Sequence, residues 1–147
     1  MDLILWRHAD AEYSSPDIAR TLTDKGRKQA KRMAAWLKPR LPEGTHILVS
    51  PASRAQQTAV ALNMDFSTLD AIAPGASAQA LLAAAGWPAQ GGCVLLVGHQ
   101  PSLGETAALL LSGQPHGWSL KKGAICWLRT GEDGDCHLRA VLTPDLL

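Results

Sequence analysis

The chain has 147 residues, of which 46% are hydrophobic and 18% are charged, and its formal net charge is +1. This length and composition suit one globular domain with a substantial core, so we expect residues 1–147 to form a single domain. The near-zero net charge argues against broad affinity for nucleic acid, and no apolar run approaches the roughly 18 residues of a membrane span. We therefore expect neither nucleic acid nor a membrane as a partner.

The three cysteines, Cys93, Cys126 and Cys136, show no CxxC spacing and leave one without a partner. A disulfide framework is therefore not expected, and Cys93 and Cys126, which lie in apolar runs, are interpreted as buried thiols in a reducing compartment. The apolar run at the N-terminus is too short for a signal peptide. We expect a cytoplasmic monomer.

The first expected element is a strand over Asp2–Arg7, which delivers an Arg-His pair at its end. Its unbroken apolar run is typical of a strand buried on both faces of a parallel sheet, where ligands bind at the carboxyl ends of the strands. Arg offers a planar fork for phosphate oxygens, and His is a nucleophile near neutral pH. Arg7 and His8 fit phosphoryl chemistry, but the pair alone also fits an incidental charged strand end.

A second apolar strand is expected over His46–Val49, and polar residues follow it directly. Ser50 can cap a helix and Pro51 suits the first helical position. We therefore expect a helix over Pro51–Leu62, with Arg54 about one turn from its start.

A third apolar strand, Cys93–Val97, runs into His99, and a helix is expected to follow over Pro101–Leu111. Because the carboxyl ends of parallel strands lie on one edge of a sheet, the polar residues after these three strands are expected to meet there. They are Arg7, His8, Arg54 and His99.

The rest of the chain continues to alternate between helices and strands. Further helices are expected over Asp24–Lys38 and Ser77–Ala85, and further strands near Thr68–Ile72, Trp118–Leu120, Gly123–Arg129 and His137–Leu142. Residues 130–135 are rich in Gly and Asp, which predicts a hairpin turn between the last two strands. The pattern predicts a three-layer α/β/α sandwich with a mostly parallel sheet and an antiparallel edge.

Three motifs carry a resemblance to a known family. WRHA at residues 6–9, SPASRAQQTA at 50–59 and VGHQPSL at 97–103 resemble the histidine phosphatase superfamily, which has the phosphoglycerate-mutase-like fold. The short length and the stretch DIARTLTDKG at 17–26 are most similar to its small SixA-type phosphohistidine phosphatases. The resemblance runs from Met1 to about Leu111, and it implies a phosphatase that works through a phosphohistidine enzyme intermediate.

The resemblance also implies a role for each matching residue. His8 would be the nucleophile that becomes phosphorylated. The phosphoryl oxygens would be bound by Arg7, Arg54 and His99, with Arg20 as a fourth contact.

The chain departs from the superfamily pattern in two places. Ala9 stands where many members have Gly, and residues 63–74 form a segment too short to carry the acidic proton donor of the larger members. Neither Asp65 nor Asp70 is assigned that role. A missing acid favours phosphohistidine as the substrate, because an imidazole can leave already protonated whereas an alkoxide needs a general acid.

The chemistry also follows from the residue types themselves. Two Arg forks and a second imidazole supply the positive charge that phosphoryl transfer needs, so neither a metal nor a cofactor is expected. An attacking His8 must be neutral, whereas His99 is more useful as a hydrogen-bond donor to the phosphate. We therefore expect the two imidazoles to have different protonation states.

The predicted partner is a phosphorylated protein of a signalling relay, such as a histidine phosphotransfer domain. Two alternatives stay open: a phosphomonoesterase for a small phosphate ester, and a non-catalytic phosphate-binding module. The helix over residues 24–38 is strongly basic, which indicates either a solvated face or a docking surface for an acidic protein. Trp87 lies in an expected loop and Trp118 directly follows one, and either could edge a binding surface.

Overall fold

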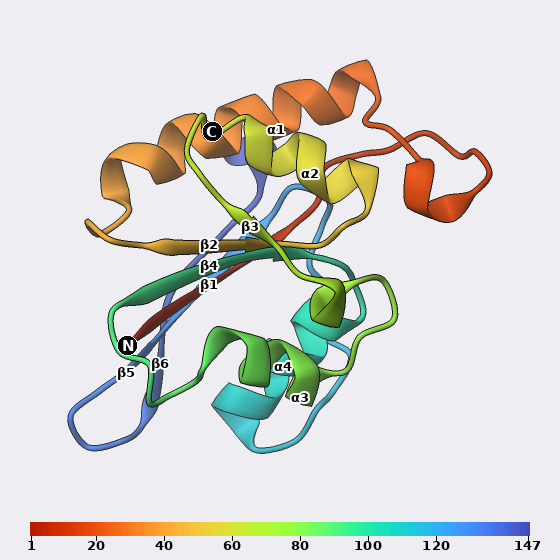
Figure 1. Cartoon of the computed structure of the whole chain (residues 1–147). Coiled ribbons are helices and arrows are strands. Elements are labelled where there is room, and N and C mark those ends of the chain that lie inside the picture. The colour runs from red at the N-terminus through yellow and green to blue at the C-terminus, as the bar shows by residue number, and fades with distance from the viewer.

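The computed structural model covers residues 1–147 and has one six-stranded sheet between two layers of helices (Figure 1). The strands are β1 (Asp2–Arg7), β2 (His46–Val49), β3 (Ser67–Thr68), β4 (Cys93–Gly98), β5 (Ile125–Thr130) and β6 (Cys136–Leu142). Their order is β3-β2-β4-β1-β5-β6, in which the first four are parallel and the last two are antiparallel to their neighbours. This arrangement confirms the predicted sandwich with an antiparallel edge.

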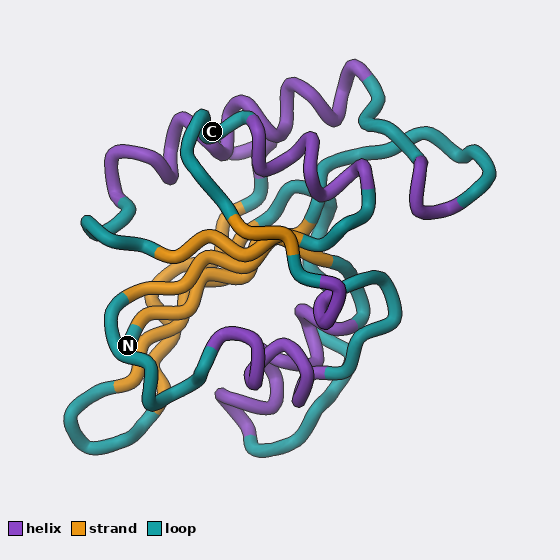
Figure 2. Tube along the Cα trace, in the orientation of Figure 1, coloured by secondary structure: helices purple, strands orange, loops and turns teal.

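The helices cover the two faces of this sheet in pairs (Figure 2). On one face lie α1 (Asp24–Leu37) and α2 (Ser53–Val60), and on the other lie α3 (Ala78–Ala85) and α4 (Ser102–Ser112). Four short 3₁₀ helices lie in the connections: η1 (Asp17–Ala19), η2 (Lys38–Arg40), η3 (Asp70–Ile72) and η4 (Pro144–Leu146). None of the helices combines the length and the apolar character needed to cross a membrane.

The central strand β1 contributes to both halves of the core. Ile4 and Trp6 pack against the α1 and α2 side, whereas Leu3 and Leu5 pack against the α3 and α4 side. All four are at most 1% exposed, and burial of each such side chain stabilises the fold by about 1.5–3 kcal/mol. Packing on both faces therefore fixes the position of β1 and of the Arg-His pair at its end.

The start of α1 is fixed against the loop that follows β1. The Thr23 hydroxyl accepts the Gly26 N–H at 2.9 Å and donates to the Asp10 carboxylate at 2.7 Å. A side chain at position 26 would overlap the Asp10 carbonyl oxygen, so this close approach needs glycine. The contact ties the first helix to the segment that carries His8.

The start of α2 differs from its prediction. The helix begins at Ser53, and Ala52 occupies the cap position without a side-chain cap. Ser50 does not cap this helix, because its hydroxyl lies 2.7 Å from a ring nitrogen of His99 and accepts the Ala52 N–H at 3.2 Å. Arg54 is consequently the second residue of the helix.

One predicted strand is shorter and earlier than expected, and another is absent. Around residues 68–72 only Ser67–Thr68 is a strand, and the chain then turns into η3. Residues 118–120 form no strand, because the carbonyls of Trp118 and Leu120 accept hydrogen bonds from the side chains of Gln100 and Arg7 instead of from a neighbouring strand.

The other predicted elements agree with the structure to within two residues at each end. The hairpin turn is confirmed, with a 2.8 Å bond from the Gly131 N–H to the Asp135 carbonyl. All three cysteines are free, and Cys93 and Cys126 are buried as expected.

Candidate active site

Polar side chains gather at the carboxyl edge of the parallel strands, where the loop of residues 8–23 projects to the right in Figure 1. The edge is held together by backbone hydrogen bonds between the strand ends. The His8 N–H donates to the Gly98 carbonyl at 3.1 Å, and the Ser50 N–H donates to the Val97 carbonyl at 3.1 Å. The residues that follow β1, β2 and β4 are therefore neighbours, as the parallel register predicts.

His8 is oriented with one ring nitrogen available for attack. Its Nδ1 lies 2.7 Å from the Ala9 carbonyl oxygen, and because a carbonyl only accepts, Nδ1 carries the ring proton and Nε2 keeps its lone pair. Burial is the main cause that lowers the pKa of His8 to about 4. The guanidinium groups of Arg54, Arg7 and Arg20 act in the same direction. His8 is therefore a neutral imidazole at neutral pH.

His99 lies beside His8, with their ring centroids 5.2 Å apart. Its Nε2 is 2.7 Å from the Ser50 hydroxyl, which can donate its proton there, and its Nδ1 is buried without a partner in the protein. Burial, followed by the charges of His8 and Arg54, lowers the pKa of His99 to about 3. The expected difference in protonation between the two imidazoles is therefore wrong for the free protein, because burial keeps both neutral. A neutral His99 can still donate through Nδ1–H.

In both Arg7 and Arg54, Nη1 of the guanidinium is hydrogen-bonded within the protein, whereas Nε is not. The Arg7 Nη1 donates to the Leu120 carbonyl at 2.7 Å, and the Arg54 Nη1 donates to the Asp17 carbonyl at 2.8 Å. The Nε atoms of both arginines are buried without a hydrogen-bond partner. Buried unpaired donors each cost about 1–3 kcal/mol, which an anionic ligand can recover.

Arg20 reaches the same site from η1 but is more exposed. Its Nε donates to the Glu12 carbonyl at 2.7 Å, and its Nη1 pairs with the Asp17 carboxylate at 3.2 Å. The other oxygen of that carboxylate pairs with Arg54 Nη2 at 3.2 Å. Asp17 thus bridges two of the predicted phosphate-binding arginines, and the hydrogen bond from Arg20 is the main cause that lowers its pKa.

Sequence reasoning missed three residues that position this site: Ser50, Thr58 and Asp17. Thr58 is fully buried, accepts the Ala9 N–H at 3.0 Å and donates to the Arg54 carbonyl at 2.7 Å. It therefore ties the loop after His8 to the helix that carries Arg54. The only sequence signal for Ser50 and Thr58 is their place inside the SPASRAQQTA stretch, and Asp17 has no signal beyond its nearness to Arg20.

The two tryptophans that could edge a binding surface differ in exposure. Trp118 is 43% exposed, and its carbonyl accepts a bond from Gln100, the residue after His99. Trp87 is half-buried and packs on the α3 and α4 side of the core. Only Trp118 lies in a segment bonded to the site. Of the two, it remains the candidate for the edge of a binding surface.

The low pKa values of His8 and His99 predict a pH dependence of stability. Each histidine is neutral in the folded protein but gains a proton near its ordinary pKa of about 6.5 once unfolded. The free energy of unfolding is therefore expected to have its highest value above pH 6.5 and to decrease as the pH drops toward 4. The decrease due to His8 should be on the order of 3 kcal/mol. Urea unfolding at a series of pH values measures it. The same series on the His8→Ala protein should fall less steeply, and an unchanged slope would contradict the assignment.

The comparisons with known proteins agree with this geometry. Residues 3–73 match the model of the histidine phosphatase superfamily, branch 1. This chain belongs to the histidine phosphatase superfamily. An uncharacterized protein of Picosynechococcus sp. is 38% identical over 89% of this chain and 86% of its own length. The phosphohistidine phosphatase SixA of Escherichia coli is 41% identical over 59 residues, which are 40% of this chain and 37% of SixA.

Solved structures extend the similarity over the whole chain. The protein histidine phosphatase SixA complexed with tungstate superimposes with a TM-score of 0.85 at 26% identity, covering 99% of both chains. A phosphoserine phosphatase of Entamoeba histolytica shares the fold with a TM-score of 0.74, at 18% identity and over 99% of this chain and 98% of its own. The family and the SixA structure support phosphatase activity for this chain.

Proposed function

We propose that this protein is a single-domain, metal-independent phosphatase that hydrolyses phosphohistidine on a protein, with His8 as the nucleophile. The observation that carries the proposal is the set of three buried side-chain nitrogens without a hydrogen-bond partner. They are Arg7 Nε, Arg54 Nε and His99 Nδ1. His99 lies beside His8, and the charges of Arg7 and Arg54 act on the His8 ring, so donors from these three residues suit the equatorial oxygens of a phosphoryl group.

Two displacement steps complete the proposed reaction. In the first, the Nε2 lone pair of His8 forms a bond to phosphorus, and the bond between phosphorus and the leaving nitrogen of the substrate breaks. In the second, a water oxygen attacks phosphorus, the new P–N bond breaks with its electron pair returning to His8 Nε2, and the inorganic phosphate that leaves carries the protons of the water. Arg7 and Arg54 bind the phosphoryl oxygens through both steps. Tungstate is an oxyanion, so the SixA structure that contains it supports the binding of an anion of this shape at the site.

The proton balance supports phosphohistidine over an alkyl phosphate. Asp17 is the carboxylate that contacts the site arginines, and Arg20 holds its pKa below the usual range, so it is ionised and unsuited to donate a proton. Asp65 and Asp70 make no hydrogen bond or ion pair with the site residues and are exposed. An imidazole leaving group needs no such donor, because its second ring nitrogen can already carry a proton.

The surroundings of the site suit a protein substrate. Tyr13 is 89% exposed, Ile18 is 45% exposed and Trp118 is 43% exposed, and all three belong to segments bonded to site residues. Exposed apolar side chains around a reactive centre are typical of a surface that receives another protein. An enclosed metabolite pocket would instead bury them.

The substrate class is tested by comparing kcat/KM for three substrates in one buffer. We expect a phosphohistidine peptide to exceed p-nitrophenyl phosphate, and both to exceed a sugar phosphate, since an alkoxide without proton assistance loses about 10²–10⁴ in rate. The His8→Ala protein serves as the control for spontaneous hydrolysis of the peptide. A sugar phosphate turned over fastest would replace this proposal with a metabolic phosphomonoesterase.

A further inference from the structure

A basic cleft opens directly beside the proposed phosphoryl site. It consists of two adjoining hollows of about 480 and 290 Å³ that share Lys25, Gln29, Pro144 and Asp145. One wall is a face of α1, the other is the segment of residues 119–122, and the C-terminal η4 closes it. Arg7, which precedes His8 in the chain, lines the larger hollow, so the cleft adjoins the proposed site.

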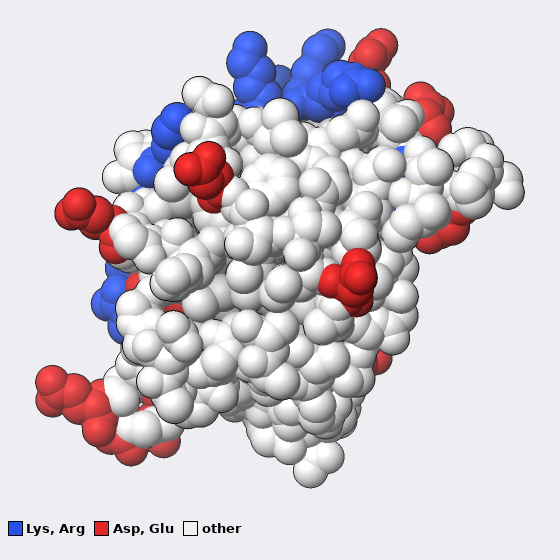
Figure 3. All heavy atoms as spheres, in the orientation of Figure 1, with Lys and Arg blue, Asp and Glu red and all other residues white.

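Positive charge is concentrated in this cleft. Six basic side chains line it: Arg7, Lys25, Lys28, Arg32, Lys121 and Lys122. Only Asp10 and Asp145 oppose them, which gives the cleft a net charge of +4 in a chain whose total is +1. Figure 3 shows Lys and Arg side chains gathered over α1, the helix that forms one wall of the cleft.

Most of these cations have no acidic partner within the protein. Lys122 is paired with Asp10 at 2.8 Å, which makes it part of the scaffold. Lys25, Lys28, Arg32 and Lys121 are exposed and take part in no ion pair. Their charges are therefore available to an external anion.

The shape and lining of the cleft indicate the class of that anion. Leu120 is the one hydrophobic residue among the ten that line the larger hollow, so an apolar small molecule has little to bind. No aromatic ring lines either hollow, which removes the stacking platform that single-stranded nucleic acid uses. Spaced cations along an open cleft suit the carboxylates of an acidic polypeptide segment.

We propose that this cleft binds an acidic segment of the phosphorylated partner protein and so presents its phosphoryl group to His8. The Arg7 side chain links the two regions, because its Nη1 is bonded to the Leu120 carbonyl while its buried Nε has no partner. The identification of the partner as the substrate rests on the proposed function, whereas the preference for acidic protein rests on the cleft alone.

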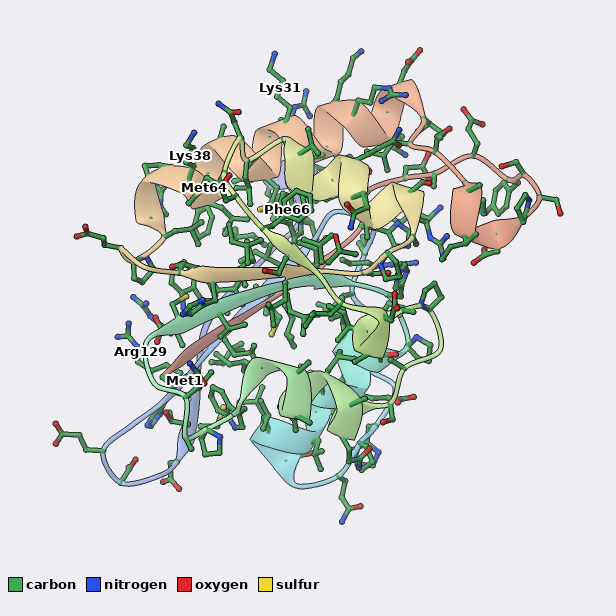
Figure 4. The ribbon with its side chains drawn as sticks, in the orientation of Figure 1. Met1, Lys31, Lys38, Met64, Phe66 and Arg129 are labelled. Carbon is green, nitrogen blue, oxygen red and sulfur yellow. The ribbon has the colours of Figure 1, made fainter.

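The geometry of α1 supplies a matched control for the test. Lys25 and Lys28 lie on the cleft face, whereas Arg27, Lys31 and Lys38 are exposed residues that line neither hollow. Figure 4 shows Lys31 on the outer side of α1, pointing away from the sheet, and Lys38 near the C-terminal end of that helix, where η2 begins. At 100° per residue Arg27 and Lys31 lie about 110° or more from the middle of the α1 face that lines the two hollows.

The cleft variant is Lys25→Glu with Lys28→Glu and Lys121→Glu, and the control variant is Arg27→Glu with Lys31→Glu and Lys38→Glu. Both change the net charge by the same amount, so a difference between them reports position. The probes are two peptides of one sequence that flank a central histidine either with Glu and Asp or with Gln and Asn. Each peptide is used with and without chemical phosphorylation of the histidine.

The unphosphorylated acidic peptide is expected to bind the wild-type protein and the control variant about tenfold more tightly than the cleft variant. Its affinity should fall several-fold as salt rises from about 0.05 to about 0.3 M. With the phosphorylated peptides, kcat/KM should favour the acidic one by about tenfold in wild type and control, and by a ratio near one in the cleft variant. The neutral peptide also reports whether each variant is folded.

The outcomes separate this inference from the proposed function. Equal affinities of the two triple variants for the acidic peptide overturn the docking site, even if both phosphopeptides are hydrolysed. Hydrolysis of neither phosphopeptide overturns the proposed substrate, and the binding series then decides the docking site by itself. Tighter binding of a single-stranded oligonucleotide than of the acidic peptide overturns the assignment to a protein partner.

Discussion

Replacement of His8 by alanine is expected to lower the phosphatase rate by at least about 10³–10⁴-fold while the protein stays folded. The reason is that His8 Nε2 is the unprotonated nitrogen that the Ala9 carbonyl bond and burial keep ready for attack. Without it no phosphoenzyme can form. The measurement is steady-state hydrolysis of p-nitrophenyl phosphate and of a phosphohistidine peptide, with circular dichroism to check the fold.

A matched replacement of His46 by alanine controls for the loss of an imidazole. His46 is exposed at the amino end of β2, at the opposite edge of the sheet from the site, so its variant should keep the wild-type rate. Rapid quenching with radiolabelled substrate should trap phosphate on the peptide that contains His8. A chelator should leave the wild-type rate unchanged. Activity that survives in the His8 variant, or that vanishes with chelator, would exclude a covalent mechanism without metal.

The fold was largely predictable because its strong signals are local. β1 and β4 are continuous apolar runs, and the structure buries both of them on two faces. The errors occur where a tertiary contact decides the backbone. Residues 118–120 have an apolar pattern but use their carbonyls to accept from Arg7 and Gln100, and no sequence pattern encodes that pairing.

The candidate site was predictable to the extent that strand ends and motifs define it. Arg7, His8, Arg54 and His99 lie at or soon after the ends of parallel strands, and the structure brings these four together. Their roles in binding and catalysis remain predictions that the variants described here test.

The sequence could not show which contacts position the site residues or which protonation states the histidines have. The bond between Ser50 and His99 joins residues 49 positions apart, and the ion pair between Asp17 and Arg54 joins residues 37 positions apart. Such contacts depend on the packed fold. The neutral state of His99 in the free protein depends on burial, which residue type and spacing do not report.

Arg54→Ala is expected to lower kcat/KM by about 10²–10³-fold and to weaken inhibition by tungstate. Arg54 is 4% exposed and its buried Nε has no partner in the protein, so on this proposal its loss removes a donor for the phosphoryl oxygens. It also removes a positive charge that depresses the pKa of both His8 and His99. The pKa values of the two imidazoles should therefore rise toward their ordinary value, which NMR titration of the ring protons measures.

Arg54→Lys separates charge from geometry at the same position. Lysine keeps the positive charge, so the pKa of His8 should stay low, but it lacks the planar fork and should recover only part of the rate. Arg27→Ala removes an exposed arginine of α1 that makes no ion pair, and it should change neither the rate nor the titration. If tungstate inhibits Arg54→Ala as strongly as wild type, Arg54 does not bind the phosphoryl group. The pKa shift would then show only that its charge lies near the two histidines.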